Sequence, residues 1–176
     1  YNSTKATSES AVASLLKPTL DTIVGFRIDE ANKRLEVYLN YWHFEPAYIA
    51  SFATMNIYLP FELVLAEDYL VFTRGSYAYS SSAATAKKVP QLNLVLSGHA
   101  SDMASALQSF LSTGYYPSNI FAIGNKQYAT SDEVMARYRA ALAWISTHGH
   151  AWISDGPYML DRFSAEGQSA VLRAFR

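Results

Sequence analysis

The chain has 176 residues, enough for one domain or two small ones with a sizeable core, which rules out a peptide hormone or a disulfide-knotted miniprotein. Half of the residues are hydrophobic and 16% are charged, against roughly 25% in an average globular protein, so a disordered chain is excluded. With 14 basic and 15 acidic residues the net charge is −1, which gives no bulk attraction to nucleic acid or anionic lipid.

Cysteine is absent and tyrosine is abundant. The lack of cysteine excludes disulfides, thiol catalysis, iron–sulfur clusters and cysteine-ligated zinc. The 13 Tyr and 3 Trp combine a ring that can be buried with a polar tip, a composition suited to ligand clefts and interfaces as well as to cores. The sequence opens at Tyr1 without a signal segment, and we expect it to be a portion of a longer chain.

The N-terminal part predicts a flexible segment and then an ordered domain. Residues 1–10 are polar and are expected to be loose, whereas residues 11–176 are expected to form a single α/β domain or a lobe fragment of a larger protein. The first predicted helix has apolar residues near one face, and Pro18 is expected to shorten it or bend its end.

The next elements follow from turn and helix-start signals. Apolar runs at 22–28 and 34–42 flank a polar turn and predict a half-buried β-hairpin. Pro46 and Pro60 each predict the start of an apolar helix. The small, hydroxyl-rich residues of 75–90 predict an exposed loop or a flexible connection.

Two longer helices are predicted in the C-terminal half. The first carries apolar residues at helical spacing and ends at Gly114, after a strand or buried turn at 92–98. The second spans 132–147, with Ser131 as its N-cap, and stops near Gly149. The remaining residues predict three strands separated by turns.

Two histidines follow the second long helix. His148 and His150 lie close together in sequence and suggest a metal site, but the chain offers neither cysteine nor a fixed carboxylate partner. A role for His148 at the helix C-terminus, where its charge interacts with the helix dipole, is the favoured interpretation. We therefore expect no metal and no cofactor.

The sequence gives little support for a hydrolase. The G-x-S-x-G signal of many serine hydrolases does not occur, and the serines at 80–82 fit turn chemistry. Glu62, Glu67 and Asp68 are on a predicted helix and are expected to face solvent, although a long-range carboxylate pair of the glycosidase type stays open.

Aromatic residues cluster in two places. Tyr41, Trp42 and His43 end the predicted hairpin, and Trp152 and Tyr158 lie near the C-terminus. Core packing and a ligand-facing role both remain open for these rings.

Two segments resemble family 5 extracellular solute-binding proteins, the peptide-binding components of ABC importers. The segment 23–54 resembles the family's strand-turn-strand-helix unit, with Asp29, Val37 and Leu39 in the matching places. The segment 153–176 is similar to the family's G-T-G-P-Y-x-L segment: Gly156 and the following Pro-Tyr-x-Leu match, whereas Ser154-Asp155 replaces Gly-Thr. The order of the motifs looks most like that of archaeal members.

The resemblance implies a mixed sheet with packed helices, forming part of a periplasmic-binding-protein-like lobe, and no catalysis. It implies a peptide or sugar ligand in an interlobe cleft, delivery to ABC permease subunits, and contact with the remainder of the parent chain. It also implies an extracellular location, with membrane anchoring through parts absent here, and no nucleic-acid partner. Family members are much longer and close two lobes around the ligand, so this chain is expected to hold only part of that clamp.

By motif position, the ligand-binding residues are predicted to be Tyr41, Trp42, His43, Trp152, Asp155 and Tyr158. Two alternatives stay open. One is an interaction or structural module derived from a binding protein, and the other is a Ser/His hydrolase.

Overall fold

The computed structural model describes residues 3–53, 59–154 and 156–174. It combines helices with short strand pairs, which confirms the predicted mixed α/β class. The helices are α1 (Ser3–Ser8), α2 (Ser10–Thr22), α3 (Pro46–Ala53), α4 (Phe61–Asp68), the π-helix η1 (Tyr69–Thr73), α5 (Ser81–Lys87), α6 (Ser97–Thr113), the 3-10 helix η2 (Ser118–Ile120) and α7 (Ser131–His148). The strands are β1 (Ile23–Asp29), β2 (Arg34–Leu39), β3 (Ala122–Ile123), β4 (Lys126–Gln127), β5 (Tyr158–Ser164) and β6 (Ser169–Ala174).

The strands of the described ranges form three separate two-stranded antiparallel sheets, β1–β2, β3–β4 and β5–β6. Each pair is joined by a short turn, and such a turn can only connect antiparallel neighbours. The described residues therefore contain no mixed sheet, which corrects that expectation, and their parallel pairing is limited to an isolated bridge between Ala78 and Gln91. The predicted hairpin at 22–42 is confirmed as β1–β2.

The N-terminal segment is more ordered than the sequence predicted. Residues 3–8 form helix α1, which corrects the expectation of a loose segment, and Glu9 is fully buried. Helix α2 continues through Pro18 to Thr22, so proline does not shorten it. No residue of α2 is buried, and the helix therefore gains little from packing.

The core lies where α4 and η1 pack against α6 and α7. Its buried side chains come from successive turns of these helices at the spacing that places them on one face. The largest fully buried apolar ones are Leu63, Leu70, Met103, Leu107, Val134 and Tyr138. Helices were predicted at Pro46 and Pro60, and both are confirmed.

Three local expectations are corrected. The segment 75–90 contains helix α5, which begins because the Ser80 hydroxyl accepts the N–H of Ala83 at 3.2 Å. Helix α7 has Thr130 rather than Ser131 as its N-cap. The first of the three predicted C-terminal strands is absent, since residues 151–154 have no regular structure.

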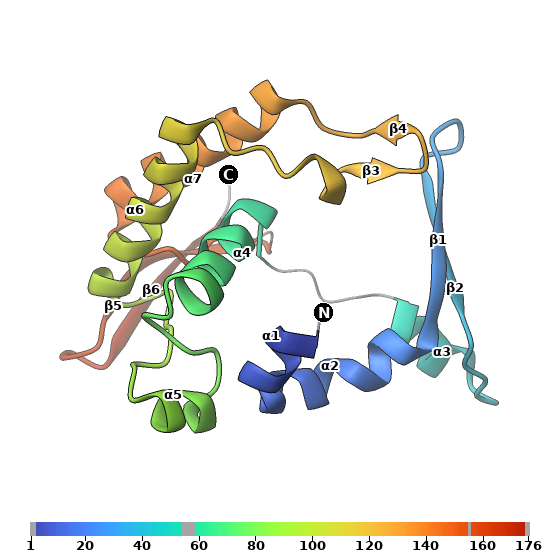
Figure 1. Ribbon diagram of the computed structural model, residues 1–176, viewed down its shortest axis with the longest axis horizontal. Coiled ribbons are helices and arrows are strands. Elements are labelled where there is room, and N and C mark those ends of the chain that lie inside the picture. The colour runs from blue at the N-terminus through green and yellow to red at the C-terminus, as the bar shows by residue number, and fades with distance from the viewer. Residues whose placement is uncertain (1–2, 54–58, 155, 175–176) are drawn as a thin grey trace.

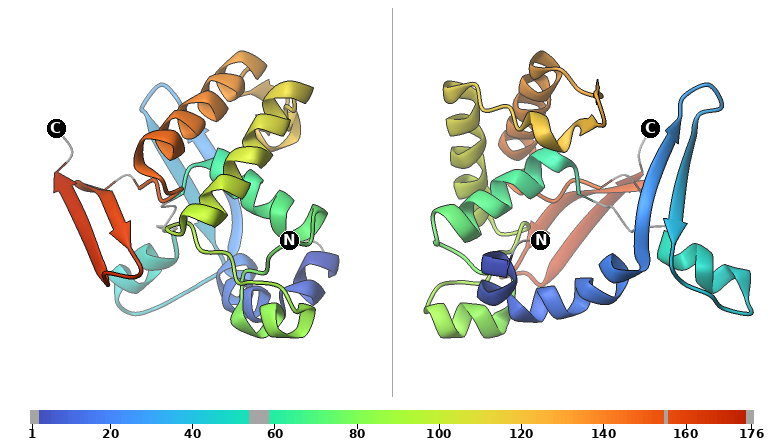
Figure 2. Two further views of the ribbon diagram at one scale, coloured as in Figure 1. Left: turned by 90° about the vertical axis from the view of Figure 1, so that its left-hand side faces the viewer. Right: turned by 45° about the vertical axis from the view of Figure 1, so that its right-hand side comes forward.

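Figure 1 shows how these elements are arranged in space. The helices α4, α6 and α7 and the β5–β6 hairpin lie at one side, and the β1–β2 hairpin and α3 lie at the other. Helix α2 runs along the bottom of that view between α1 and β1. The right-hand view of Figure 2 shows β1–β2 standing away from α4, α6 and α7 as an arm. At its turn, Glu30 forms an ion pair with Lys126 of β4.

Candidate functional site

The first predicted aromatic group forms a packed cluster between β2 and α3. The ring centroids of Tyr41 and His43 are 6.5 Å apart and nearly parallel, and Tyr48 lies 4.4 Å from His43. Phe52 of α3 contacts Tyr41 at 4.5 Å. Trp42 is 80% exposed, so it is the ring of this group that is freest to meet a ligand or another surface.

The second predicted group surrounds the start of β5. Trp152 is 38% exposed and its backbone N–H donates to Nδ1 of His150 at 3.2 Å. Tyr158 is 58% exposed and opens β5. Asp155, the third predicted residue of this group, lies outside the described residues.

The two groups lie on elements at opposite sides of the molecule. The chain between β2 and α3 belongs to the arm, whereas β5 starts beside the helical core (Figure 1). The structure therefore packs the rings of Tyr41 and His43 together in the first group, and among the described residues it places the two groups on separate elements.

The paired histidines have structural roles. His150 is buried; its Nε2–H donates to the carbonyl of Leu160 at 3.0 Å, and its Nδ1 accepts from the backbone, so the ring is neutral in this arrangement. Burial lowers the pKa of His150, which agrees with the neutral form. The ring of His148 packs 4.0 Å from that of Trp144. Across the described ranges, no group of three or more His, Cys, Asp or Glu side chains is placed to hold a metal ion.

The acidic residues of α4 do not simply face solvent, which corrects the sequence interpretation. Glu62 is 2% exposed, and its Oε1 lies 2.9 Å from a guanidinium nitrogen of Arg137 on α7. Burial, together with the negative charge of Asp68, raises the pKa of Glu67 to about 7. The reason is that α4 is packed by other helices on more than one side, so its polar positions meet protein groups.

A pocket of about 540 Å³ lies beside Asp68, the last residue of α4. Helix α1, the α4–η1 segment, the C-terminal turn of α6 and the chain around η2 form its walls. Its lining mixes charges with rings, including Lys5, Asp68, Tyr69, Phe72, Phe110 and Tyr115. A volume in this range is typical of small-molecule sites, which span roughly 300 to 1,000 Å³.

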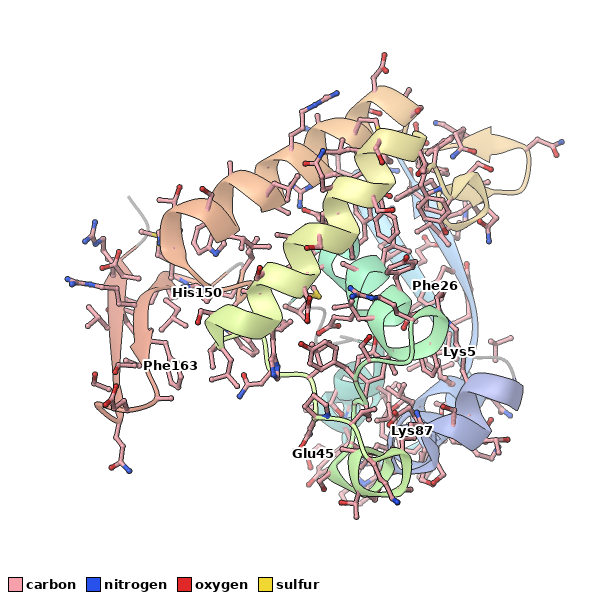
Figure 3. The ribbon with its side chains drawn as sticks, turned by 60° about the vertical axis from the view of Figure 1, so that its left-hand side comes forward. Lys5, Phe26, Glu45, Lys87, His150 and Phe163 are labelled. Atoms are coloured by element: carbon pink, nitrogen blue, oxygen red, sulfur yellow. The ribbon has the colours of Figure 1, made fainter. Side chains whose placement is uncertain are left out.

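Asp68 is the fixed anion of the pocket. Its Oδ2 lies 2.5 Å from Nζ of Lys5, and the hydroxyl of Tyr79 donates to Oδ1 at 2.8 Å. The Lys5 ammonium also lies 4.8 Å from the centre of the Phe72 ring, within cation–π range. Figure 3 shows Lys5 between α1 and α4 and Lys87 at α5 below it.

The π-helix shapes one wall of the pocket. In η1 the backbone N–H of Arg74 donates to the carbonyl of Tyr69 at 2.8 Å, five residues back. The wider turn changes the direction in which Tyr69 and Phe72 project, and π-helical turns are found often at functional sites. The sequence carried no signal for it, because the apolar run through 61–73 also fits a regular helix.

The serines at 80–82 are explained by structure. The Ser80 hydroxyl caps α5 and also donates to Glu9 at 2.9 Å, so it supports the junction between α5 and the N-terminal helices. Turn chemistry in a loop was expected of these serines, whereas Ser80 is the N-cap of a helix.

The sequence matches no protein-family profile, and no curated protein matches it at a significant level.

Proposed function

We propose that this chain is part of the extracytoplasmic solute-binding component of an ABC importer. In this proposal it binds oligopeptides or oligosaccharides without chemical change and hands them to membrane permease subunits. The remainder of the parent chain supplies the second wall of the interlobe cleft. The protein acts outside the cell, and other segments of the parent chain anchor it at the membrane. Within the described residues no helix is long and apolar enough to cross a membrane.

The observation that carries the proposal is the pocket of about 540 Å³ beside η1. Its rings offer broad apolar contact, while Lys5 and Asp68 offer charge. Such a mixture suits ligands that differ in side chains and share a polar backbone. The ordered resemblance of segments 23–54 and 153–176 to family 5 binding proteins supports the same class.

The test is an NMR titration of the chain with a short-peptide mixture and, separately, with a sugar panel. We expect saturable shifts of pocket amides for one ligand class, with weak affinity because one lobe supplies only part of the contacts. Tyr115→Ala should weaken binding about tenfold, because the ring is 44% exposed in the pocket wall. Tyr128→Ala, of similar exposure and outside the pocket, is the matched control. Shifts for neither class would overturn the proposal.

An interaction module is the second candidate, and exposed apolar side chains on both large hairpins favour it. On β1–β2 these include Val24 and Leu35, which are 71% and 62% exposed, and Leu172 of β6 is 63% exposed. Large exposed apolar surface marks contact with another protein surface. Light scattering across a concentration series tests this candidate, and a strictly monomeric chain that also fails to capture other segments of the parent protein would count against it.

A further inference from the structure

The pocket beside η1 already holds one ammonium group, that of Lys5. One oxygen of Asp68 contacts Nζ of Lys5 at 2.5 Å, and the hydroxyl of Tyr79 holds the other oxygen at 2.8 Å. The Phe72 ring lies on the second side of the cation, with the ring centre 4.8 Å from Nζ. A carboxylate held from behind and a ring face together select a cation over a neutral group.

The C-terminal turn of α6 also favours a positive charge in the pocket. The last turn of α6, with Ser109, Phe110 and Thr113, lines the pocket, and it contains no basic residue. The C-terminus of a helix carries partial negative charge, so it attracts a cation from elsewhere. Lys5 lines the same pocket as this turn.

The pocket has room for more than the lysine that enters it. The volume of about 540 Å³ remains with Lys5 in place. Its other walls include Leu65, Tyr69 and Tyr115, which suit an apolar or aromatic body.

Helix α1 is a short element that ends directly before the buried Glu9. It has six residues, and a helix this short is marginal by itself. Glu9 lies between α1 and α2, and its φ of −129° and ψ of 59° are outside the helical region. The Glu9 side chain is buried against Lys87 and Ser80, whereas its backbone N–H donates to the carbonyl of Lys5 at 3.0 Å.

We propose that the pocket binds ligands with a primary ammonium group on an apolar or aromatic body, and that α1 occupies it with Lys5 as an internal, displaceable competitor. This inference rests on the proposed ligand-binding function and names the chemistry of the same site. The apparent affinity for such a ligand is reduced by the fraction of molecules in which Lys5 holds Asp68. Removing the Lys5 ammonium therefore strengthens binding.

The probe is phenethylamine, with 2-phenylethanol as the neutral control of similar shape. NMR titrations compare the wild type with Lys5→Met, which keeps an apolar stem, and with Asp68→Asn, which keeps the shape of the carboxylate. We expect Lys5→Met to bind phenethylamine about tenfold more tightly and Asp68→Asn about tenfold more weakly. The affinity for 2-phenylethanol should stay the same in all three proteins. Lys17→Met, which removes an exposed ammonium paired with Asp21, should behave as the wild type.

Hydrogen exchange supplies a second readout that does not depend on Asp68→Asn folding correctly. Phenethylamine should speed amide exchange in residues 5–8 of the wild type and leave exchange in the core helix α7 unchanged. Equal affinities of wild type and Lys5→Met, or equal binding of the amine and the alcohol, would overturn the inference. In either case the peptide and sugar titrations still decide the proposed function separately.

Discussion

Glu9 shows how one buried charge organises the N-terminal segment. Its carboxylate is fully buried and receives Nζ of Lys87 at 3.0 Å, together with backbone and hydroxyl donors from residues 79–80. Burial alone would raise the pKa of Glu9, but the hydrogen bonds from Lys87, Ser80 and the backbone outweigh it and lower the pKa. The charged form is therefore part of the folded structure.

Replacing Glu9 tests this anchor. We expect Glu9→Ala to lower the free energy of unfolding by about 2 to 4 kcal/mol, because it leaves Lys87 and two backbone donors without their partner. Urea denaturation at pH 7 measures the change. Since the folded-state pKa of Glu9 is lowered, the loss should be full above about pH 4.5 and shrink as the pH falls below it. Glu30→Ala, at an exposed ion pair, is the control with little expected effect.

The contribution of Glu67 to stability should depend on pH in the opposite direction to that of Glu9. Its pKa rises from 4.5 to about 7 on folding, so between these values the folded chain keeps a proton that the unfolded chain has released. Stability from this group therefore falls as the pH rises through that window, by about 2 kcal/mol for a partly exposed side chain.

The variant Glu67→Gln removes that titration. The melting temperature of Glu67→Gln minus that of the wild type should increase from pH 5 to pH 8. Glu166→Gln, in an exposed turn, should follow the wild type throughout. Parallel melting curves for Glu67→Gln and the wild type across this range would contradict the assigned burial of Glu67.

At the scale of single elements, the ends of helices follow local chemistry closely. Gly114 and Gly149 end α6 and α7 with φ of 62° and 72°, a left-handed conformation that glycine adopts without strain. The start of α7 was predicted one residue too late. Thr130 forms a reciprocal capping box with Glu133, whereas Ser131 is the first helical residue.

The cap assignment can be tested with two alanine variants. Thr130→Ala should lower the free energy of unfolding by about 1 kcal/mol, because the N–H of Glu133 loses its acceptor. Ser131→Ala should be nearly neutral, since its exposed side chain lies inside the first turn. Chemical denaturation of both variants measures the difference, and a larger effect at Ser131 would contradict the capping box.

At the scale of the whole molecule, the turn of the β1–β2 arm contacts β4, whereas its other end contacts α2 and α3. Glu30 pairs there with Lys126, whose ammonium also lies 5.1 Å from the centre of the Tyr128 ring. The pair is exposed, so salt screens it. The contact therefore sets the position of the arm more than the stability of the fold.

A charge swap tests this contact. Lys126→Glu should widen the distance distribution between spin labels placed at Asn32 and Ser112, because it sets two negative charges against each other. Adding Glu30→Lys should restore the narrow distribution. Molar salt should widen the wild-type distribution as well. Failure of the double variant to restore it would show that the arm is held by other contacts.

Short-range signals account for the parts of the fold that were predicted. The β1–β2 hairpin, the helices at Pro46 and Pro60, and the helix ends at Gly114 and Gly149 all depend on residues within a few positions of each other. Local sequence missed α1 and α5, and both contact distant partners, although the Ser80 cap of α5 is itself a local signal. Lys5 is held by Asp68, and the start of α5 is tied to Glu9.

The candidate site was the least predictable feature. The sequence by itself determined a cysteine-free, aromatic-rich chain of mixed α/β class, with two aromatic clusters at Tyr41–His43 and Trp152–Tyr158. Only the tertiary structure decided that those clusters lie apart, and that Lys5, Asp68 and Phe72 meet in one pocket. The physical reason is that a pocket depends on how helices far apart in the chain pack, whereas composition and periodicity report only local preference and burial.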